Sequence, residues 1–329
     1  MQAFFEAAFS SSLGAMVVVI TLGVLFVNGW TDAPNAIASA IATRALTMGQ
    51  GVLMAGILNG LGGLAALTLG DKVAETVLNL GNFSADAGAA ALAAAMLAVI
   101  LWAVAAWWFG IPTSESHGLM AALMGASLAL SAGGISLPAL GRVACGLIFS
   151  VGLGYLGGMG FSALFAKIGA RPAFWRGGQM VSAALMAFAH GLQDTPKFAS
   201  ILLLGKSLWG AGASEELPLW MLLLCSAVMS AGTLLGGGRI IRKVGEEMVV
   251  MDQRQGFAAD LAGTVSLLLS TLQGLPVSTT HAKTCAMMGA AGQVDRKIAG
   301  SMFLAWGLTF PICGGLAFLL AKLFFLFPF

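Results

Sequence analysis

The same short polar stretches occur twice in this chain, about half a chain apart, within otherwise apolar sequence. Residues 28–35 (NGWTDAPN) are echoed by residues 190–197 (HGLQDTPK), 162 positions later. Residues 110–117 (GIPTSESH) are echoed by residues 274–281 (GLPVSTTH), 164 positions later. Because two different motifs recur in the same order at nearly the same offset, the chain contains a duplicated unit. Two copies that meet around a shared polar site are the layout of many secondary transporters.

The composition places this duplicated unit in a membrane. The chain is 58% hydrophobic and only 9% charged, whereas a soluble domain carries about 25% charged residues. Five apolar runs approach or exceed the ~20 residues that cross a bilayer as a helix: 13–27, 88–109, 137–166, 216–236 and 298–327. Because these runs are continuous rather than alternating, a β-barrel is not expected. We predict an all-α, multi-pass protein of the inner or plasma membrane.

The polar segments divide the chain into domains. We predict transmembrane repeat 1 at residues 1–166, a basic cytoplasmic linker at 167–178 and transmembrane repeat 2 at 179–329. Basic residues cluster in this linker and again in the loop 239–256, with two apolar stretches between them. Both clusters should therefore lie on one side of the membrane, the cytoplasmic side. No polybasic stretch with interleaved aromatic residues is present, so nucleic acid is not an expected partner.

Prolines mark the places where the helices of each repeat should break. Proline removes a backbone donor and disfavours helix at the preceding residue, so Pro34 and Pro196 predict unwound or re-initiated helix beside Asp32 and Asp194. After Pro112 and Pro276 the apolar arms are too short to cross a bilayer comfortably. We therefore expect each repeat to contain a broken helix at its Asp motif and a re-entrant helical hairpin.

Asp32 and Asp194 are the clearest functional candidates. An ionisable residue inside a membrane segment costs about 2.5–3.5 kcal/mol on insertion scales, which makes it a functional-site hypothesis by default. The alternative is an interfacial cap or a loop acid, and duplication of the whole motif argues against it. A carboxylate beside loose backbone carbonyls suits a monovalent cation, a proton, or the hydroxyl of a protonated oxyanion.

Hydroxyl-rich segments follow the proline of each hairpin. Hydroxyls and free backbone N–H groups at a helix N-terminus form an anion site, whereas the alternative is ordinary N-capping that needs no ligand. The duplication favours a site. Its candidate residues are Ser114, Glu115 and Ser116 in the first hairpin and Ser278, Thr279 and Thr280 in the second.

The histidines and cysteines give little support for an enzyme or a metal centre. All three histidines (His117, His190 and His281) lie in the duplicated motifs, where each could bind substrate, relay protons or hold a hairpin in place. We favour the structural role. The four cysteines occur singly, as small buried residues would. Gly-x-Ser-x-Gly and Walker motifs and a metal-binding histidine cluster are absent from the sequence, so we predict no enzyme activity, no cofactor and no bound metal other than a coupling Na⁺.

These motifs closely resemble those of the inorganic phosphate transporter (PiT) family. That family is marked by a duplicated Gly-Ala-Asn-Asp-x-x-Asn-Ala element and duplicated Gly-(Leu/Ile)-Pro-Val-Ser-Thr-Thr-His hairpins. The resemblance extends over nearly the whole chain and includes residues 43–46 (TRAL), 256–261 (GFAADL) and 305–311 (AWGLTFP). It implies inverted-topology repeats, a homodimer, and secondary transport of phosphate coupled to sodium ions or protons. It also implies that the Asp elements and hairpin tips form the substrate and ion sites.

The chain departs from the family pattern at several motif positions. Thr31 and Gln193 each stand where the family has Asn, and we expect them to replace its amide contacts. Lys197 also stands in place of an Asn, and Glu115 replaces a Thr. If the repeats interlock around one centre, Glu115 and Lys197 lie close and offset each other. A Lys ammonium also takes the electrostatic place of Na⁺, so Lys197 is predicted to have removed one cation site, unless it snorkels to an interface.

We therefore predict a symporter that imports inorganic phosphate with Na⁺ or H⁺ by alternating access. Asp32, Asn35 and Asp194 would bind the coupling cation, and the substrate-binding residues would be Thr31, Asp32, Asn35, Ser114, Glu115, Ser116, Gln193, Asp194, Lys197, Ser278, Thr279 and Thr280. One competing hypothesis is a sulfate or related oxyanion permease, although sulfate has no proton to donate to the two carboxylates. Two further hypotheses are an intramembrane hydrolase and a passive anion channel.

Overall fold

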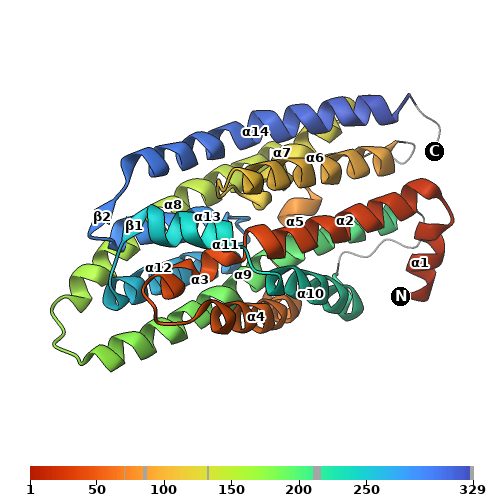
Figure 1. The fold of residues 1–329 in the computed structure, drawn as a ribbon. Coiled ribbons are helices and arrows are strands. Elements are labelled where there is room, and N and C mark those ends of the chain that lie inside the picture. The colour runs from red at the N-terminus through yellow and green to blue at the C-terminus, as the bar shows by residue number, and fades with distance from the viewer. Residues whose placement is uncertain (70, 84–86, 132, 210–215, 327–329) are drawn as a thin grey trace.

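The chain folds almost entirely into helices. The computed structural model describes residues 1–69, 71–83, 87–131, 133–209 and 216–326, and its long helices pack side by side in one bundle (Figure 1). In the first half the helices are α1 (Gln2–Phe9), α2 (Ser12–Thr31), α3 (Pro34–Ala42), α4 (Met48–Leu69), α5 (Asp71–Leu78), α6 (Gly88–Trp108), α7 (Glu115–Ala129) and α8 (Leu137–Phe165). In the second half they are α9 (Pro172–Leu208), α10 (Leu219–Leu234), α11 (Gly238–Ile241), the π-helical η1 (Arg242–Glu247), α12 (Gln253–Leu272), α13 (Thr279–Ala290) and α14 (Arg296–Phe324). Strands β1 (Val249–Val250) and β2 (Gln293–Val294) form a short antiparallel pair between loops.

Several of these helices can cross a bilayer. In the described part of the chain, five helical segments are long and apolar enough: Ser12–Ala42, Met48–Leu69, Gly88–Trp108, Leu137–Phe165 and Arg296–Phe324. The pair Leu219–Leu234 and Gly238–Glu247, bent by 65°, is a sixth candidate. The protein is therefore a multi-pass membrane protein. The five runs predicted from sequence fall on helices α2, α6, α8, α10 and α14, whereas α4 was missed because Asn59 and several glycines interrupt its apolar sequence.

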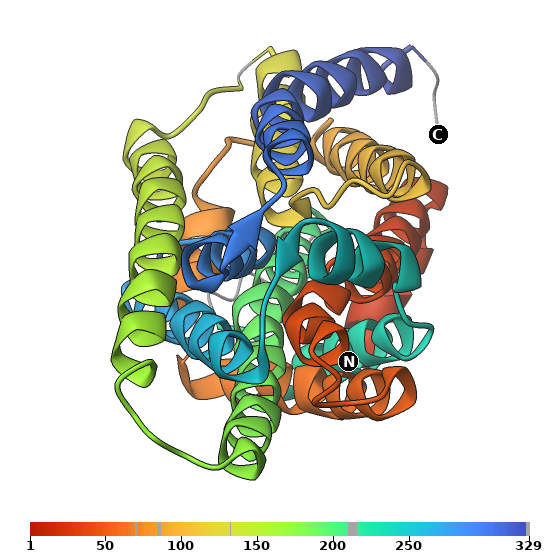
Figure 2. The same ribbon diagram turned by 60° about the vertical axis from the view of Figure 1, so that its left-hand side comes forward.

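Several helices of each half pack against helices of the opposite half. The hairpin arm α7 lies against α14, the closing helix of the second half, and α13 lies against α8, the closing helix of the first (Figure 2). In the same way α4 packs on α9, and α10 packs on α2. The contacts of one half thus reappear in the other with the partners exchanged. This is the arrangement expected of two copies that interlock around a common centre.

The glycine of each Asp motif makes a close helix crossing possible. A Cβ on Gly29 would lie 2.1 Å from the backbone oxygen of Met229 in α10, and one on Gly191 would lie 2.0 Å from that of Asn59 in α4. Only glycine permits this approach, as in other close helix contacts in membranes. Because both crossings sit next to an Asp motif, they bring the two motifs toward the middle of the bundle.

The predicted helix break is found in the first repeat only. Helix α2 ends at Thr31, and α3 begins at Pro34, where a proline at the first helical position is tolerated. The prediction of unwound helix at Pro196 is wrong, because α9 runs unbroken from Pro172 to Leu208 with that proline inside it. Packing on α4 and α12 along its length, and an ion pair between Asp194 and Lys197 one turn apart, hold α9 helical there.

Each hairpin turns at an equivalent glycine. Gly110 and Gly274 have φ of +64° and +68°, a backbone conformation that glycine adopts without strain. The arms that follow the turns are short, 15 residues in α7 and 12 in α13. Ser114 and Ser278 cap these arms, and each hydroxyl accepts a 3.1 Å hydrogen bond from the backbone N–H of His117 or His281. The N-capping that the sequence also suggested for these serines is therefore present.

The two basic clusters lie at one end of the bundle. Arg176 donates to the backbone oxygen of Ala45, and Gln253 donates to that of Thr43, each at 3.3 Å. The start of α9 and the loop before α12 therefore meet beside the end of α3, which agrees with the prediction that both clusters share a side. Helix α9 already begins within the predicted linker 167–178. The prediction that all four cysteines are buried fails for Cys145, which is exposed on α8.

Candidate functional site

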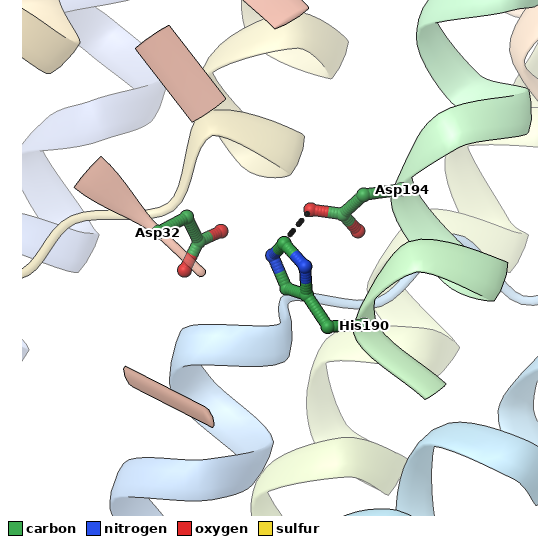
Figure 3. Close-up of side chains that lie close together, drawn as sticks. All are labelled: Asp32, His190 and Asp194. Atoms are coloured by element: carbon green, nitrogen blue, oxygen red, sulfur yellow. Dashed lines mark ion pairs between the residues drawn. The ribbon is translucent and has the colours of Figure 1, made fainter. Parts of the chain in front are cut away.

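The predicted site residues converge in the interior. All of the predicted substrate-binding side chains are 4% exposed or less: Thr31, Asp32, Asn35, Ser114, Glu115, Ser116, Gln193, Asp194, Lys197, Ser278, Thr279 and Thr280. They come from the break between α2 and α3, the middle of α9 and the starts of α7 and α13. Figure 3 shows Asp32 and Asp194 pointing toward each other from different elements.

Asp32 binds the hairpin of the second repeat. Thr280 donates a short hydrogen bond to Asp32 Oδ1, and Thr279 donates to Oδ2 at 3.1 Å. Asn35 Nδ2 bridges the two elements, with 3.0 Å to Asp32 Oδ1 and 2.9 Å to Thr280 Oγ1. The first Asp motif and the second hairpin tip therefore form one hydrogen-bonded unit.

Asp194 binds the hairpin of the first repeat in the equivalent way. Ser116 donates to Asp194 Oδ1 at 3.3 Å. Lys197 Nζ lies 2.8 Å from that oxygen and 2.8 Å from Ser116 Oγ, and it also donates to the backbone oxygen of Val277 at 2.6 Å. Asn28 donates to the other carboxylate oxygen at 3.2 Å. Lys197 thus bridges Asp194 and Ser116 as Asn35 bridges Asp32 and Thr280, and it adds a positive charge.

These contacts decide between the interpretations of Lys197 and show the hydrogen-bond partner of Glu115. Lys197 is fully buried, so the snorkelling hypothesis is wrong. Lys197 pairs with Asp194, and Glu115 Oε1 accepts a 2.5 Å hydrogen bond from Thr31, so neither of these contacts joins Glu115 to Lys197 directly. That the two charges lie close and offset each other stays a prediction. Lys197 and Asp194 lie one helical turn apart on the same helix, which makes their pairing a local one. Glu115 Oε2 is buried with no hydrogen-bond partner among the described residues.

Gln193 and the histidines have contacts that sequence reasoning did not specify. Gln193 donates to the backbone oxygen of Leu275 at 2.9 Å and accepts from Thr271 at 2.5 Å, so it fixes the second hairpin. His190 was assigned a hairpin role, but it lies on α9 with Nε2 3.5 Å from Asp194 (Figure 3). Its Nδ1 lies 2.9 Å from Asn59 Oδ1. His117 and His281 contact each other, with ring centroids 4.7 Å apart, between the two hairpin arms.

One cluster has the geometry to hold a cation. Asp32, His190 and Asp194 each offer a ligand atom, and these atoms all lie within 4.8 Å of one another. Two carboxylates and further oxygens nearby suit a hard cation better than a soft metal. Asn35 Oδ1 and Asn28 Oδ1 are also buried without partners among the described residues. These two carbonyl oxygens, one on the neighbour of Asp32 and one on the neighbour of Asp194, are therefore available as further acceptors.

Sequence reasoning missed part of the polar interior. Asn28 and Asn59 were not singled out, although Asn28 opens the duplicated motif. A separate buried cluster of Ser39, Asp260 and Lys283 was also missed. Lys283 could have revealed this cluster, because it is an ionisable residue inside the short arm 282–292, which was treated as wholly apolar.

Comparison with known proteins identifies the family. The sequence profile described as "Phosphate transporter family" matches this chain twice, at residues 28–173 and 168–317. The chain belongs to the phosphate transporter family. This family consists of transporters, and its members are not enzymes. The double match agrees with the duplicated motifs, with one match on each half of the chain.

Individual relatives match over nearly their full length. A probable low-affinity inorganic phosphate transporter of Rhizobium meliloti is 33% identical over 322 residues, which covers 93% of this chain and 95% of that protein. A Bacillus subtilis protein of the same description is 28% identical and covers 95% and 98%. A solved structure titled "The sodium-dependent phosphate transporter" superimposes with a TM-score of 0.85 at 19% identity over both complete chains. That structural likeness establishes the fold.

Proposed function

We propose that this protein is a symporter that imports inorganic phosphate together with Na⁺ or H⁺ by alternating access. The observation that carries the proposal is the crossed pairing at the centre, where each Asp motif is bonded to the hairpin tip of the opposite repeat. A movement of one repeat against the other therefore changes the environment of both carboxylates. The names of the relatives support phosphate as the substrate.

The hairpin tips supply the anion-binding groups. Helices α7 and α13 begin at the centre, so the positive ends of their dipoles and their first backbone N–H groups face the site. Thr279, Thr280 and Ser116 add hydroxyl groups. The two carboxylates would accept hydrogen bonds from a protonated phosphate, and sulfate has no such proton to offer at neutral pH. This set of groups favours phosphate over sulfate.

The charges at the centre support a single coupling-cation site on the Asp32 side. Asp194 already has the Lys197 ammonium at 2.8 Å, whereas Asp32 has no Lys or Arg within ion-pair distance among the described residues. Glu115 lies on the same side, bonded to Thr31, which is the neighbour of Asp32 in the chain. A cation between these acids would offset negative charge in a water-poor interior. Lys197 would then act as a tethered cation in the other half.

The direct test is labelled phosphate uptake into liposomes that contain the purified protein. We expect uptake to follow an imposed Na⁺ or H⁺ gradient, to resist excess sulfate, and to fall by about 10- to 100-fold in Asp32→Asn, which loses a charged hydrogen-bond acceptor. A thermal unfolding scan of Asp32→Asn controls for its folding. Uptake without any gradient would indicate a channel, and equal competition by sulfate would indicate a general oxyanion permease.

A further inference from the structure

A second buried ion pair lies outside the central site. Lys283 on α13 pairs with Asp260 Oδ1 on α12 and donates to Ser39 Oγ on α3 at 2.8 Å. Ser39 in turn donates to Asp260 Oδ1 at 2.5 Å. All three side chains are fully buried. We call these three residues the α3–α12–α13 cluster.

The cluster lies one helical turn from the central site. On α3, Ser39 follows Asn35 by four residues, and on α13, Lys283 follows Thr280 by three. Asn35 and Thr280 are bonded to each other at 2.9 Å in the central site, and Ser39 and Lys283 are bonded in the next layer. Helix α3 then ends beside Thr43 and Ala45, at the end of the bundle with the basic loops. The cluster therefore separates the central site from that end.

The equivalent place on the other side of the duplicated fold provides an internal control for this cluster. The motif offsets of 162 and 164 residues place Ile201, Met96 and Leu119 at the positions equivalent to Ser39, Asp260 and Lys283. All three are fully buried and belong to one apolar core. The fold thus fills the same place without charges. Because a buried ion pair is often no more stabilising than apolar residues of similar volume, the charged version calls for a role other than stability.

The cluster has unused acceptor capacity. Asp260 Oδ2 and Thr284 Oγ1 are buried without hydrogen-bond partners among the described residues. Asp260 and Lys283 have only each other as ion-pair partners within the described chain. Helix α3 contributes no ionisable side chain, and the other titratable groups of α13 are His281 and Cys285. The titratable groups of α9 near this level are His190 and Asp194, and both belong to the central site. Helix α8 carries Arg142, Cys145 and Tyr155, and these make no ion pair with the cluster.

We propose that the α3–α12–α13 cluster is the site of a proton taken up when phosphate binds, an inference that rests on the proposed function. Asp260 and Lys283 together are neutral, so a proton from solution added to Asp260 Oδ2 gives the cluster a charge of plus one. A phosphate anion one turn away favours that charged state by electrostatic attraction. Because Lys283 Nζ lies against Asp260 Oδ1, the pair carries no net charge when the central site holds no anion. Proton and phosphate binding are then reciprocally linked.

The test counts the protons taken up per phosphate bound, by titration calorimetry in buffers of different ionisation enthalpy. Asp260→Asn removes the acceptor, and the triple variant Ser39→Ile, Asp260→Met, Lys283→Leu installs the residues found at the equivalent positions, Ile201, Met96 and Leu119. We expect both variants to bind phosphate and to take up about one proton fewer than the wild type. An infrared band of a protonated carboxyl that appears with phosphate in the wild type should be missing in both.

Three results would overturn this inference. The first is the same proton count in wild type and variants. The second is a wild type that binds phosphate without taking up a proton. The third is loss of phosphate binding in the triple variant, which would make the cluster a structural support of the central site. A wild type that does not bind phosphate at all would instead contradict the proposed function, so the two failures are distinguishable.

Discussion

The two halves of the central site have the same geometry and different chemistry. Asn35 bridges Asp32 to Thr280, and Lys197, at the equivalent position, bridges Asp194 to Ser116 with nearly equal distances. The first bridge is a neutral amide, and the second is an ammonium group. The α3–α12–α13 cluster differs from its apolar counterpart in the same way. The two halves thus share one framework, and single residue differences within it determine where charged side chains lie.

The largest difference between the halves should appear when each Asp is neutralised. Asp194→Asn leaves the Lys197 ammonium buried without a charge partner, which should lower the free energy of unfolding by about 3–5 kcal/mol. Asp32→Asn leaves no buried cation behind, so its cost should be smaller, about 1–3 kcal/mol. Thermal unfolding in detergent compares the two. Equal losses of stability would contradict the tethered-cation interpretation of Lys197.

The hydroxyls of the two hairpin tips provide a second comparison. Thr280→Val and Ser116→Ala each remove a hydrogen bond to a carboxylate, and such bonds contribute about 1.5–3 kcal/mol. We expect phosphate affinity to fall by more in Thr280→Val, because Lys197 still holds Asp194 in place when Ser116 is truncated. Phosphate binding by calorimetry measures both changes. Thr280→Ser keeps the hydroxyl and should retain most of the affinity.

The helix crossings at Gly29 and Gly191 should respond alike to an added methyl group. This prediction tests whether the frameworks of the two halves are equivalent. A methyl group on Gly29 or Gly191 meets a backbone oxygen at about 2 Å, and overpacking of this kind costs about 1–3 kcal/mol. Gly29→Ala and Gly191→Ala should therefore destabilise the protein to a similar degree. Gly152→Ala, on a helix face with open space, is the matched control and should be neutral or slightly stabilising. A clear difference between Gly29→Ala and Gly191→Ala would show that the two crossings are not equivalent.

Local patterns in the sequence were sufficient to predict much of this structure. The length of the apolar runs predicts membrane helices, and the glycine, proline and serine of each hairpin predict a turn followed by a capped arm. The break after Asp32 follows from Pro34, which has the favoured first position of α3. The motifs also identify both Asp residues and both hairpin tips as parts of one site, because their duplication is visible in the sequence.

The features that were missed depend on packing between distant segments. The direct partners of Lys197 and Glu115, which are Asp194 and Thr31, were not predicted, since sequence does not show which way each side chain points. Helix α9 stays intact at Pro196 because its neighbours hold it, which no local rule reports. Ser39, Asp260 and Lys283 come from three helices, so their meeting is invisible in any one segment. The inverted topology and the homodimer stay predictions.

The measurement that tests the central claim most directly is the ion gradient that balances a fixed phosphate gradient in proteoliposomes, compared between wild type and Lys197→Asn. Net flux stops at a gradient set by the number of coupled ions, so the result does not depend on how fast the variant works. Sodium and proton gradients are imposed separately, with the membrane potential clamped. Asn at position 197 restores to the second half the amide that Asn35 provides in the first. We predict that this variant couples one more cation per phosphate and balances at a smaller ion gradient. An unchanged balance point would contradict it.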